Sequence, residues 1–282
     1  MKKIVIPTDF SETSMNAIMY AVHLFKHDIS EITILHAYAD EVYKNTTTLD
    51  REGFDEYKDA YQQKIEKALQ KEVAEILEVS PNPKHTYTYV SCFGSLVDEI
   101  NQIVDKQNAD LVVMGTKGKT NDRNITFGSN TLQVIKYVEC PVLAVPAAYH
   151  REYPKNILFP TDYMLSYKRR ELKLLSTLAK NYSATVNFLY VSDFKPSSHR
   201  QLDNKMFLDS SFKENRCTNL KTAGTDITAS INTTIADQKI DMLVMVNRRH
   251  SYLENILYSS TIEDIGLQIK IPFLVLQNIS RY

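Results

Sequence analysis

The sequence ADLVVMGTKG at residues 109–118, followed after nine residues by Gly128-Ser129, decides the fold. The apolar run 109–114 predicts a buried strand, and residues 130–137 predict a helix. A glycine-bearing loop between a strand and a helix start presents bare backbone N–H groups to a phosphate. Glycine suits this loop because a Cβ would hold the backbone away from the phosphate oxygens. The Ser129 hydroxyl can either cap the helix or donate to an anion.

The chain repeats its own pattern once. Three segments of the first half return in the same order in the second: IVIPTDF (4–10) as ILFPTDY (157–163), ADLVVM (109–114) as IDMLVM (240–245), and PVLAV (141–145) as PFLVL (272–276). One fold present twice is the simplest account of this order. We therefore predict two domains, covering residues 1–148 and 149–282.

Strand and helix patterns alternate within the first half. The predicted strands are 4–8, 32–37, 85–90, 110–114 and 141–146, and the predicted helices start near Ser11, Phe54, Ser95 and Asn130. Alternation predicts an α/β fold with a parallel sheet covered by helices, and the handedness of the crossovers makes it doubly wound. Residues 40–53 are interpreted as a loop, and the charges of the helix 54–79 as a solvent-facing surface.

Three segments resemble the universal stress protein family. Residues 4–12 resemble its first strand and turn, residues 114–129 match its Gly-x2-Gly-x9-Gly-Ser/Thr nucleotide signature, and residues 140–145 resemble its last strand. The resemblance implies an adenine nucleotide α-hydrolase-like fold with strand order 3-2-1-4-5 in each domain. Strands 1 and 4 are then neighbours where the strand order reverses, and ligands of such sheets bind beyond that point.

The glycine loop is predicted to hold the phosphates of a nucleotide. The main chain of five residues would do so: Gly115, Gly118, Gly128, Ser129 and Asn130. Lys117 and Lys119 either neutralise phosphate charge or are solvated loop charges, and the residues favour neither. In family members the residue between the first two glycines is often basic, which supports a phosphate contact for Lys117.

The turn after the first strand, Pro7-Thr8-Asp9, would face the glycine loop across the crevice. Asp9 either accepts from a ribose hydroxyl, helps to hold a metal ion such as Mg²⁺, or caps the following helix. Ala37 and Met114 suit an adenine slot, whereas His36 is interpreted as a structural histidine. In ATP-binding family members the turn aspartate, the residue after the second strand and the glycine loop contact the nucleotide. The resemblance therefore implies ATP as the cofactor.

The second copy departs from this signature. Aligned on its last two strands, Gly115, Gly118 and Gly128 become Val246, Arg249 and Ser259. Side chains would stand where phosphate oxygens need to sit, and a β-branched residue resists the backbone conformations that glycine allows. We predict that the second domain does not bind ATP in the manner of the first. The basic cluster 248–250 is interpreted as a solvated loop.

Composition excludes several classes of protein. The formal net charge is −1, which gives no general attraction to nucleic acid or to an anionic membrane. No apolar run approaches the length of a membrane-spanning helix. The three cysteines have no metal-ligand spacing and are interpreted as small buried hydrophobic residues. Few cysteines in an odd number fit a reducing compartment, so a cytoplasmic protein is expected.

The sequence favours an ATP-binding stress or regulatory protein. A slow ATPase or phosphoryl- or adenylyl-transfer enzyme is the alternative, and an interaction module without nucleotide is a third hypothesis. Asp9 is the only carboxylate that sequence reasoning puts in the crevice, and there is no P-loop motif, so slow or absent turnover is expected. Pairing of residues 141–146 with 271–276 would make the second domain a built-in dimer partner, and a homodimer of the whole chain is a further hypothesis.

Overall fold

The computed structural model describes residues 1–116, 127–196, 198–247 and 270–278. The first half contains β1 (Lys2–Pro7), α1 (Glu12–Leu24), β2 (Ser30–Ala37), α2 (Ala39–Asn45), α3 (Arg51–Val79), β3 (His85–Cys92), α4 (Leu96–Gln107), β4 (Leu111–Gly115), α5 (Ser129–Tyr137) and β5 (Val142–Val145). The second half contains β6 (Asn156–Pro160), α6 (Arg169–Asn181), β7 (Thr185–Val191), α7 (His199–Ser211), β8 (Arg216–Thr222), α8 (Ile227–Asp237), β9 (Met242–Asn247) and β10 (Phe273–Gln277).

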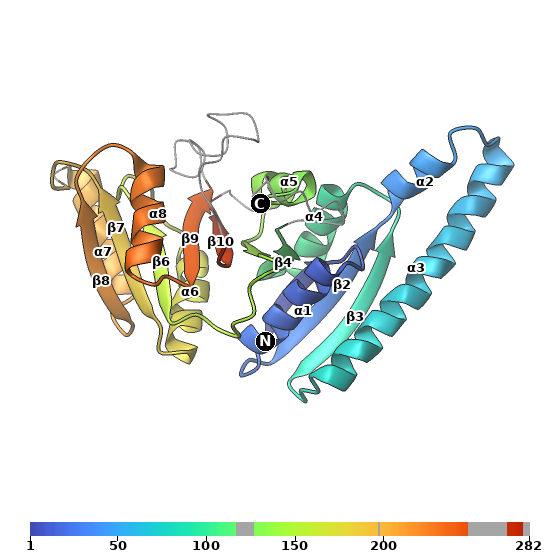
Figure 1. Ribbon diagram of the computed structural model, residues 1–282, viewed down its shortest axis with the longest axis horizontal. Helices are drawn as coiled ribbons and strands as arrows, with labels where there is room; N and C mark the ends of the chain where they lie inside the picture. The colour runs from blue at the N-terminus through green and yellow to red at the C-terminus, as the bar shows by residue number, and fades with distance from the viewer. Residues whose placement is uncertain (117–126, 197, 248–269, 279–282) are drawn as a thin grey trace.

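The ten strands described form one continuous sheet in the order β3-β2-β1-β4-β5-β10-β9-β6-β7-β8 (Figure 1). Within each half every strand pair is parallel, and the order is 3-2-1-4-5. The predicted α/β class and strand order are therefore confirmed. Alternate residues of β1 enter different cores, because Ile4 and Ile6 pack on one face of the sheet and Val5 on the other.

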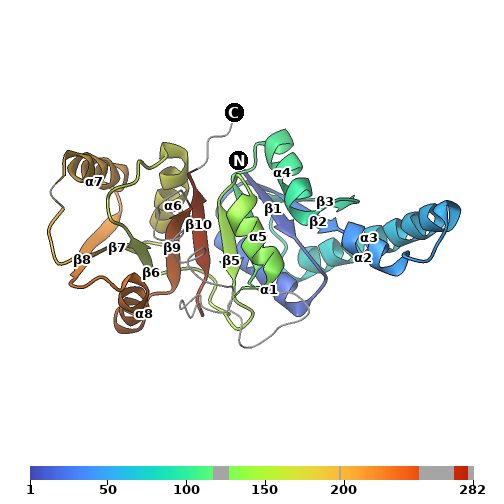
Figure 2. The same ribbon diagram turned by 90° about the horizontal axis from the view of Figure 1, so that it is seen from above.

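The two halves meet at the centre of the sheet. Strand β10 pairs antiparallel with β5, with Leu274 opposite Leu143. Figure 2 shows β5 and β10 side by side, with the two halves of the molecule to either side. Each of these strands would otherwise leave its edge unpaired, so the pairing closes two exposed edges at once. The apolar residues of both strands are fully buried there.

Further contacts join the halves away from the sheet. The Arg170 guanidinium of α6 donates to Asp110 Oδ1 at 3.2 Å and to the Ala109 carbonyl at 3.1 Å, both at the start of β4. At the other end of α6, the Tyr182 hydroxyl donates to the Leu24 carbonyl at 2.7 Å. The Tyr149 hydroxyl of the connecting segment donates to the Asp241 carbonyl at 3.0 Å. The Arg170 and Tyr182 contacts fix α6 against the first half.

Helices cover both faces of the sheet. The larger core cluster takes residues from α1, α3, α6 and α7, and the smaller one takes residues from α4, α5 and α8. Helix α3 runs beside β3 and projects with α2 beyond the sheet (Figure 1). It begins with Asp50 as its N-cap, whose side chain accepts from Gly53 N. Residues 40–53 are thus not a plain loop, because Val42 buries one side of α2.

The fold tests two expectations drawn from composition: that the cysteines are buried, and that no segment spans a membrane. Cys92 and Cys140 are buried as predicted, but Cys217 lies exposed on β8, so the prediction of three buried cysteines was wrong for that residue. Strand β8 is at the outer edge of the sheet, where few elements cover it. None of the helices in the described part of the chain has both the length and the hydropathy to cross a membrane. The basic cluster 248–250 lies outside the described residues.

Candidate functional site

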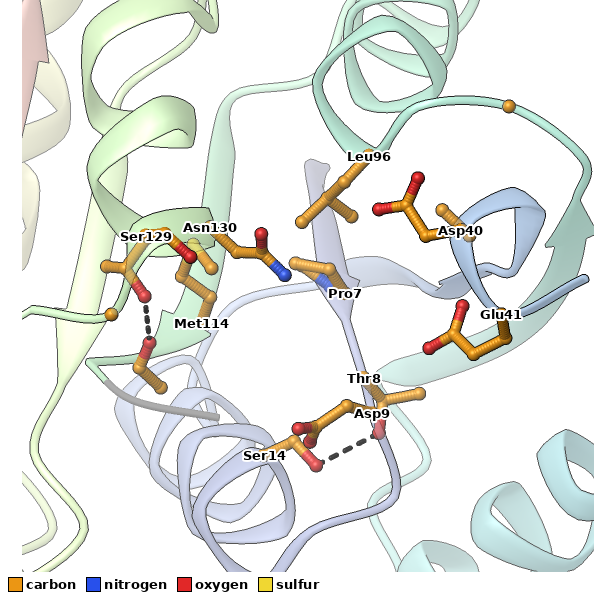
Figure 3. A pocket seen from close by; sticks show the side chains of 15 residues that line it. Pro7, Thr8, Asp9, Ser14, Asp40, Glu41, Leu96, Met114, Ser129 and Asn130 are labelled. Carbon is orange, nitrogen blue, oxygen red and sulfur yellow. Dashed lines mark hydrogen bonds between the residues drawn. The ribbon is translucent and has the colours of Figure 1, made fainter. Parts of the chain in front are cut away.

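A pocket of about 350 Å³ opens at the carboxyl ends of β1, β2 and β4 in the first half (Figure 3). This is the switch point of a doubly wound sheet, where the strand order reverses. Its lining comes from seven elements and their turns: Pro7, Thr8, Asp9, Ser14, Ala37, Asp40, Glu41, Gly94, Leu96, Met114, Gly115, Gly128, Ser129, Asn130 and Thr131.

Nine of the eleven residues predicted for the nucleotide site line this pocket. They are Pro7, Thr8, Asp9, Ala37, Met114, Gly115, Gly128, Ser129 and Asn130. The other two, Lys117 and Gly118, lie outside the described residues, as does Lys119. Segments more than 100 residues apart in the sequence therefore line one cavity.

The turn between β1 and α1 forms one wall of the pocket. Thr8 N donates to the Leu35 carbonyl at 2.8 Å, which ties the turn to β2. Phe10 adopts a left-handed backbone conformation (φ 60°), and its N–H donates to Thr8 Oγ1 at 3.0 Å. Both N–H and hydroxyl of Ser11 donate to Asp9 Oδ1. These bonds hold the Asp9 carboxylate in an Asx turn at the pocket wall.

The helix cap expected of Asp9 belongs to another residue. Ser11 is the N-cap of α1, and its hydroxyl accepts from Ser14 N at 3.2 Å. Asp9 lies two residues earlier and binds Ser11 instead of the helix backbone. The capping hypothesis for Asp9 is therefore wrong, because the turn places the chain's first helical N–H groups within reach of Ser11.

The start of α5 forms the opposite wall. Its N-cap is Gly128, and within the described residues no side chain caps the helix. Ser129 is the first helical residue and not the N-cap, so of the two alternatives for its hydroxyl, the helix cap is wrong. The N–H groups of the first turn of a helix have no acceptor within that helix. Ser129, Asn130 and Thr131 therefore present such N–H groups beside the pocket.

Hydrogen bonds bring the two ends of the glycine loop together. Gly128 N donates to the Thr116 carbonyl at 2.8 Å, and Thr131 Oγ1 donates to the Gly115 carbonyl at 2.9 Å. The carboxyl end of β4 and the start of α5 are thus fixed against each other, although the residues between them lie outside the described part. A backbone wall of this kind is pre-organised for an anion, because its N–H groups need no rearrangement.

Sequence reasoning missed the acidic side of the pocket. Asp40 and Glu41 lie in the first turn of α2 and line the cavity together with Gly94 and Leu96 (Figure 3). The statement that Asp9 is the only carboxylate of the crevice was therefore wrong. The polar composition of residues 40–53 indicated a loop and hid the helical turn that directly follows β2. The acidic residues after a strand end were the only signal available.

A hydrogen-bonded group lies behind the β1–α1 turn. Thr8 Oγ1 is 2.9 Å from Glu72 Oε1 and 3.1 Å from Ser14 Oγ (Figure 3 shows the latter). His36 is buried, with Nδ1 2.7 Å from the Thr8 carbonyl and its ring centroid 4.8 Å from that of Phe10. This agrees with the structural role predicted for His36.

Glu72 contradicts the prediction that the charges of α3 face solvent. It belongs to the buried stripe of the helix, and its side chain points toward Thr8. Burial is the main reason that the pKa of the Glu72 carboxyl is raised from 4.5 to about 7. The hydrogen bond from Thr8 lowers that pKa, and the charges of Asp9 and Glu75 raise it.

The second half contains the same turn in a different environment. Tyr163 is also left-handed (φ 58°), and its N–H donates to Thr161 Oγ1 at 2.9 Å. Met164 N donates to Asp162 Oδ1 at 2.7 Å, as Ser11 does to Asp9. The Thr161 hydroxyl, however, bonds the Tyr167 hydroxyl. Burial raises the pKa of the Asp162 carboxyl.

The phosphate side of the second half also differs. Val246 is buried near the end of β9, at the place that Gly115 occupies at the end of β4. Its side chain occupies the space that a glycine would leave open to a ligand. The residues aligned with Gly118 and Gly128 lie outside the described residues, so the comparison rests on Val246.

A sequence profile of the universal stress protein family matches residues 1–146 and 154–277. The chain belongs to the universal stress protein family. The two matched segments coincide with the two five-stranded halves of the sheet, so the chain is a tandem member with two copies of the family's unit.

Individual members agree with this assignment. The universal stress protein MJ0531 of Methanocaldococcus jannaschii is 34% identical over 145 residues, which cover 51% of this chain and 81% of the relative. MJ0577 of the same organism is 26% identical over 152 residues, covering 51% and 94%. The crystal structure of a universal stress protein from Archaeoglobus fulgidus matches across 98% of this chain and 96% of its own, with a TM-score of 0.68 and 19% identity. The last likeness shows that the tandem fold is shared.

Proposed function

We propose that residues 1–148 form a nucleotide-binding domain that holds ATP in the first-half pocket, and that occupancy regulates the protein's interactions in a stress response. The observation that carries this proposal is the uncapped start of α5, which closes on the end of β4 at the switch point of the sheet. A helix start of this kind favours negative charge through its N–H groups and its dipole.

The phosphates would lie against α5. Backbone N–H groups of Ser129 and Asn130 are the proposed donors, with Gly115 and Gly128 allowing close approach of the phosphate oxygens. Lys117 and Gly118 complete the proposed site from the glycine loop. Asp40 and Glu41 come from α2, a different part of the pocket lining. Their negative charges would repel a triphosphate and favour the orientation in which it lies against α5.

The sugar and base would lie toward β1 and β2. Asp9 is the proposed acceptor for a ribose hydroxyl, because its carboxylate is held in place by Ser11. Ala37 and Met114 line the remaining wall with a small and a polarisable side chain, which suits the flat face of adenine. Pro7 and Thr8 complete this wall.

The residues of the pocket fit Mg²⁺ only if the phosphates of the nucleotide supply most of its ligands. Asp9, Asp40 and Glu41 supply the oxygen atoms that Mg²⁺ prefers. Among the described residues, however, no three acidic, histidine or cysteine side chains come close enough together to hold a metal ion. A bound Mg²⁺ would therefore be held mainly by the phosphates, and it would neutralise part of their charge.

Residues 149–282 are proposed to act as a built-in dimer partner without an ATP site of the same kind. The β5–β10 pairing and the α6 contacts support this role. Limited proteolysis near residue 150 tests it. The two fragments are expected to stay together through gel filtration, and freely separating halves would count against the proposal.

The carboxylates of the pocket give the enzymatic alternative a specific basis. Asp40 and Glu41 add two groups that could orient a water molecule, besides Asp9. Phosphate release from ATP, measured over hours with the purified chain, tests this alternative. Release that stops in a protein carrying alanine at both positions would favour a slow ATPase, whereas our proposal expects no turnover above the uncatalysed rate.

Two measurements on the whole chain test the main proposal. Denaturing the purified protein and identifying the released small molecules by mass spectrometry is expected to yield ATP. Calorimetric titration of ligand-free protein with ATP is expected to give one site per chain, and GTP serves as the matched control for the base. No binding would refute the proposal, and two equal sites would refute the assignment of the second half. The three cysteines form no disulfide bond with one another, which agrees with the proposed cytoplasmic location.

A further inference from the structure

Glu72 is an acid in an apolar position. The structure describes α3 throughout, and its four buried residues are Ile65, Leu69, Glu72 and Ile76. The exposed fraction of Glu72 is 5%, which is unusual for a residue that ordinarily ionises. Burying a carboxylate without full hydrogen bonding is costly, so a group in this position needs a physical reason.

Counting protons shows which form of Glu72 fits. The Ser14 hydroxyl donates to the Ser11 carbonyl at 2.8 Å, so its proton is used. The Thr8 hydroxyl has one proton and two acceptors within reach, Glu72 Oε1 at 2.9 Å and Ser14 Oγ at 3.1 Å. If Glu72 is ionised, Thr8 must donate to it, and the Thr8–Ser14 contact holds no proton. Glu72 Oε2 then stays buried without a hydrogen-bond partner in the structure.

Protonation of Glu72 completes the hydrogen bonding between Glu72, Thr8 and Ser14. Its O–H can donate to Thr8 Oγ1, Thr8 can donate to Ser14 Oγ, and Ser14 donates to the Ser11 carbonyl. Thr8 Oγ1 still accepts from Phe10 N. Every hydroxyl proton of this chain of bonds then has an acceptor, so the neutral acid suits the fold better than the carboxylate.

Although its carboxyl group is buried, Glu72 borders a surface groove. Glu72 lines a groove of about 730 Å³ between α1 and α3, whose other walls include Met15 and Met19. Thr8, on the opposite side of the same hydrogen bond, lines the nucleotide pocket. The Thr8–Glu72 bond therefore spans the wall between a solvent-connected groove and the proposed ATP site.

Several charged or titratable groups surround Glu72. Those on the elements packed against it are Asp9 in the turn, Glu12 on α1, His36 on β2, Lys71 and Glu75 on α3, and His150 in the connecting segment. Asp9 and Glu75 both raise the pKa of Glu72 by repulsion. A further negative charge in the neighbouring pocket would act in the same direction.

We propose that Glu72 is a positioning residue that couples ATP binding in the first-half pocket to the uptake of a proton, through Thr8 and Ser14. This inference rests on the proposed function, because it concerns the same pocket. The proton comes from water, resides on a Glu72 oxygen while the nucleotide is bound, and returns to water on release. No bond of the nucleotide is broken.

The coupling must be reciprocal. If ATP favours the protonated form of Glu72, protonation raises the affinity for ATP by the same factor. With a pKa of about 7 in the free protein, the group is divided between both forms at neutral pH. Binding at that pH should therefore take up a fraction of a proton, up to about one half.

Among the described residues of the second half, no carboxyl group takes the place of Glu72 at the equivalent threonine. That threonine, Thr161, bonds the hydroxyl of Tyr167 instead of a carboxyl group. The turn is otherwise built in the same way, with matching bonds at Tyr163 and Met164. The difference confines the proposed coupling to the half that carries the glycine loop.

Titration calorimetry with ATP tests the coupling. The whole chain is titrated at pH 7 in two buffers of different ionisation enthalpy, which gives the number of protons exchanged. We compare the wild type with Glu72→Gln, which keeps the shape of the neutral acid, and with Glu78→Gln as the matched control. Glu78 is an exposed glutamate near the end of α3, and it is not one of the charges that shift the pKa of Glu72. Wild type and Glu78→Gln are expected to take up as much as about half a proton more than Glu72→Gln.

The pH profile supplies a second readout. From pH 6 to 9, the affinity of the wild type for ATP should fall about threefold to tenfold more than that of Glu72→Gln. Equal proton uptake and equal pH profiles in these two proteins would overturn the inference while leaving ATP binding intact. A wild type that binds no ATP would instead overturn the proposed function itself.

A direct titration covers the case in which Glu72→Gln does not fold. Carboxyl ¹³C NMR of the wild-type chain should show one glutamate with a midpoint near 7, and that midpoint should rise when ATP is added. A midpoint that ATP leaves unchanged would overturn the coupling.

Discussion

The two Thr-Asp-aromatic turns of this chain share one backbone but not one environment. In both, an aromatic residue at positive φ (Phe10, Tyr163) donates its N–H to the threonine hydroxyl two residues earlier. Their threonine hydroxyls differ in partner, because Thr8 contacts Glu72 whereas Thr161 contacts Tyr167. The comparison teaches that the local sequence sets the backbone of the turn, whereas the side chains packed behind it set the hydrogen-bond partner of the threonine.

The strand that faces each turn differs as well. Strand β4 ends in Gly115, which lines the pocket, whereas Val246 is buried near the end of β9. A duplicated fold has thus kept its architecture in both halves while the surroundings of the equivalent sites diverged. Four predictions can break or sharpen this comparison.

The largest effect is expected from Gly115→Val, which copies the residue of the second half into the first. The new side chain would enter the pocket where phosphate oxygens need close backbone approach. We expect the affinity for ATP to fall by about 100-fold, or about 3 kcal/mol, measured by calorimetry. Val246→Gly is the reciprocal control and should add no second site. Unchanged affinity in Gly115→Val would disprove the phosphate assignment.

Thr8→Val and Thr161→Val compare the two turns by stability. Both remove the acceptor for the N–H of the following aromatic residue, but only Thr8→Val also leaves Glu72 without its donor. We expect a loss of about 2–3 kcal/mol for Thr8→Val and about 1 kcal/mol less for Thr161→Val. Urea unfolding at pH 8 provides the measurement. Equal losses would mean that Glu72 does not depend on Thr8.

The pH dependence of the free energy of unfolding isolates the contribution of Glu72 to stability. A carboxyl whose pKa is raised from 4.5 to about 7 binds more protons in the folded chain, so its contribution to stability is lost as pH rises through that window. Glu72→Gln should remove this loss and be more stable than the wild type at pH 8 by about 1–3 kcal/mol. The difference should disappear near pH 4.5, and Glu78→Gln, which changes an exposed glutamate of the same helix, should follow the wild type throughout. A pH-independent difference would argue against a raised pKa.

The smallest effect is expected from Gly128→Ser, which introduces the residue that aligns with it in the second half, Ser259. Serine is a good N-cap and tolerates the extended backbone of Gly128 (φ −66°). Its hydroxyl would compete with phosphate for the first N–H groups of α5. We expect affinity for ATP to fall about threefold to tenfold, with unfolding stability unchanged within about 0.5 kcal/mol. Asp226→Ser, at the N-cap of α8, is the matched control and should leave ATP affinity unaltered.

The amino-acid sequence by itself determined most elements of the first half and their order, although it missed α2. Apolar runs such as 4–8 and 110–114 predict buried strands because a strand covered on both faces needs continuous hydrophobic residues. The repeat predicted two copies of one unit, and the family resemblance supplied the strand order. The sequence also indicated which loops meet, since the carboxyl ends of parallel strands lie at one edge.

Only the tertiary structure decided which polar side chains belong to the site. Glu72 has the same local sequence character as the exposed charges of α3, and it is buried because α3 packs its face against Thr8. Asp40 and Glu41 line the pocket because α2 begins immediately after the end of β2, at the edge of the sheet where the pocket lies. Helical periodicity records which face is apolar on average, whereas the environment of a single carboxyl depends on neighbours distant in sequence.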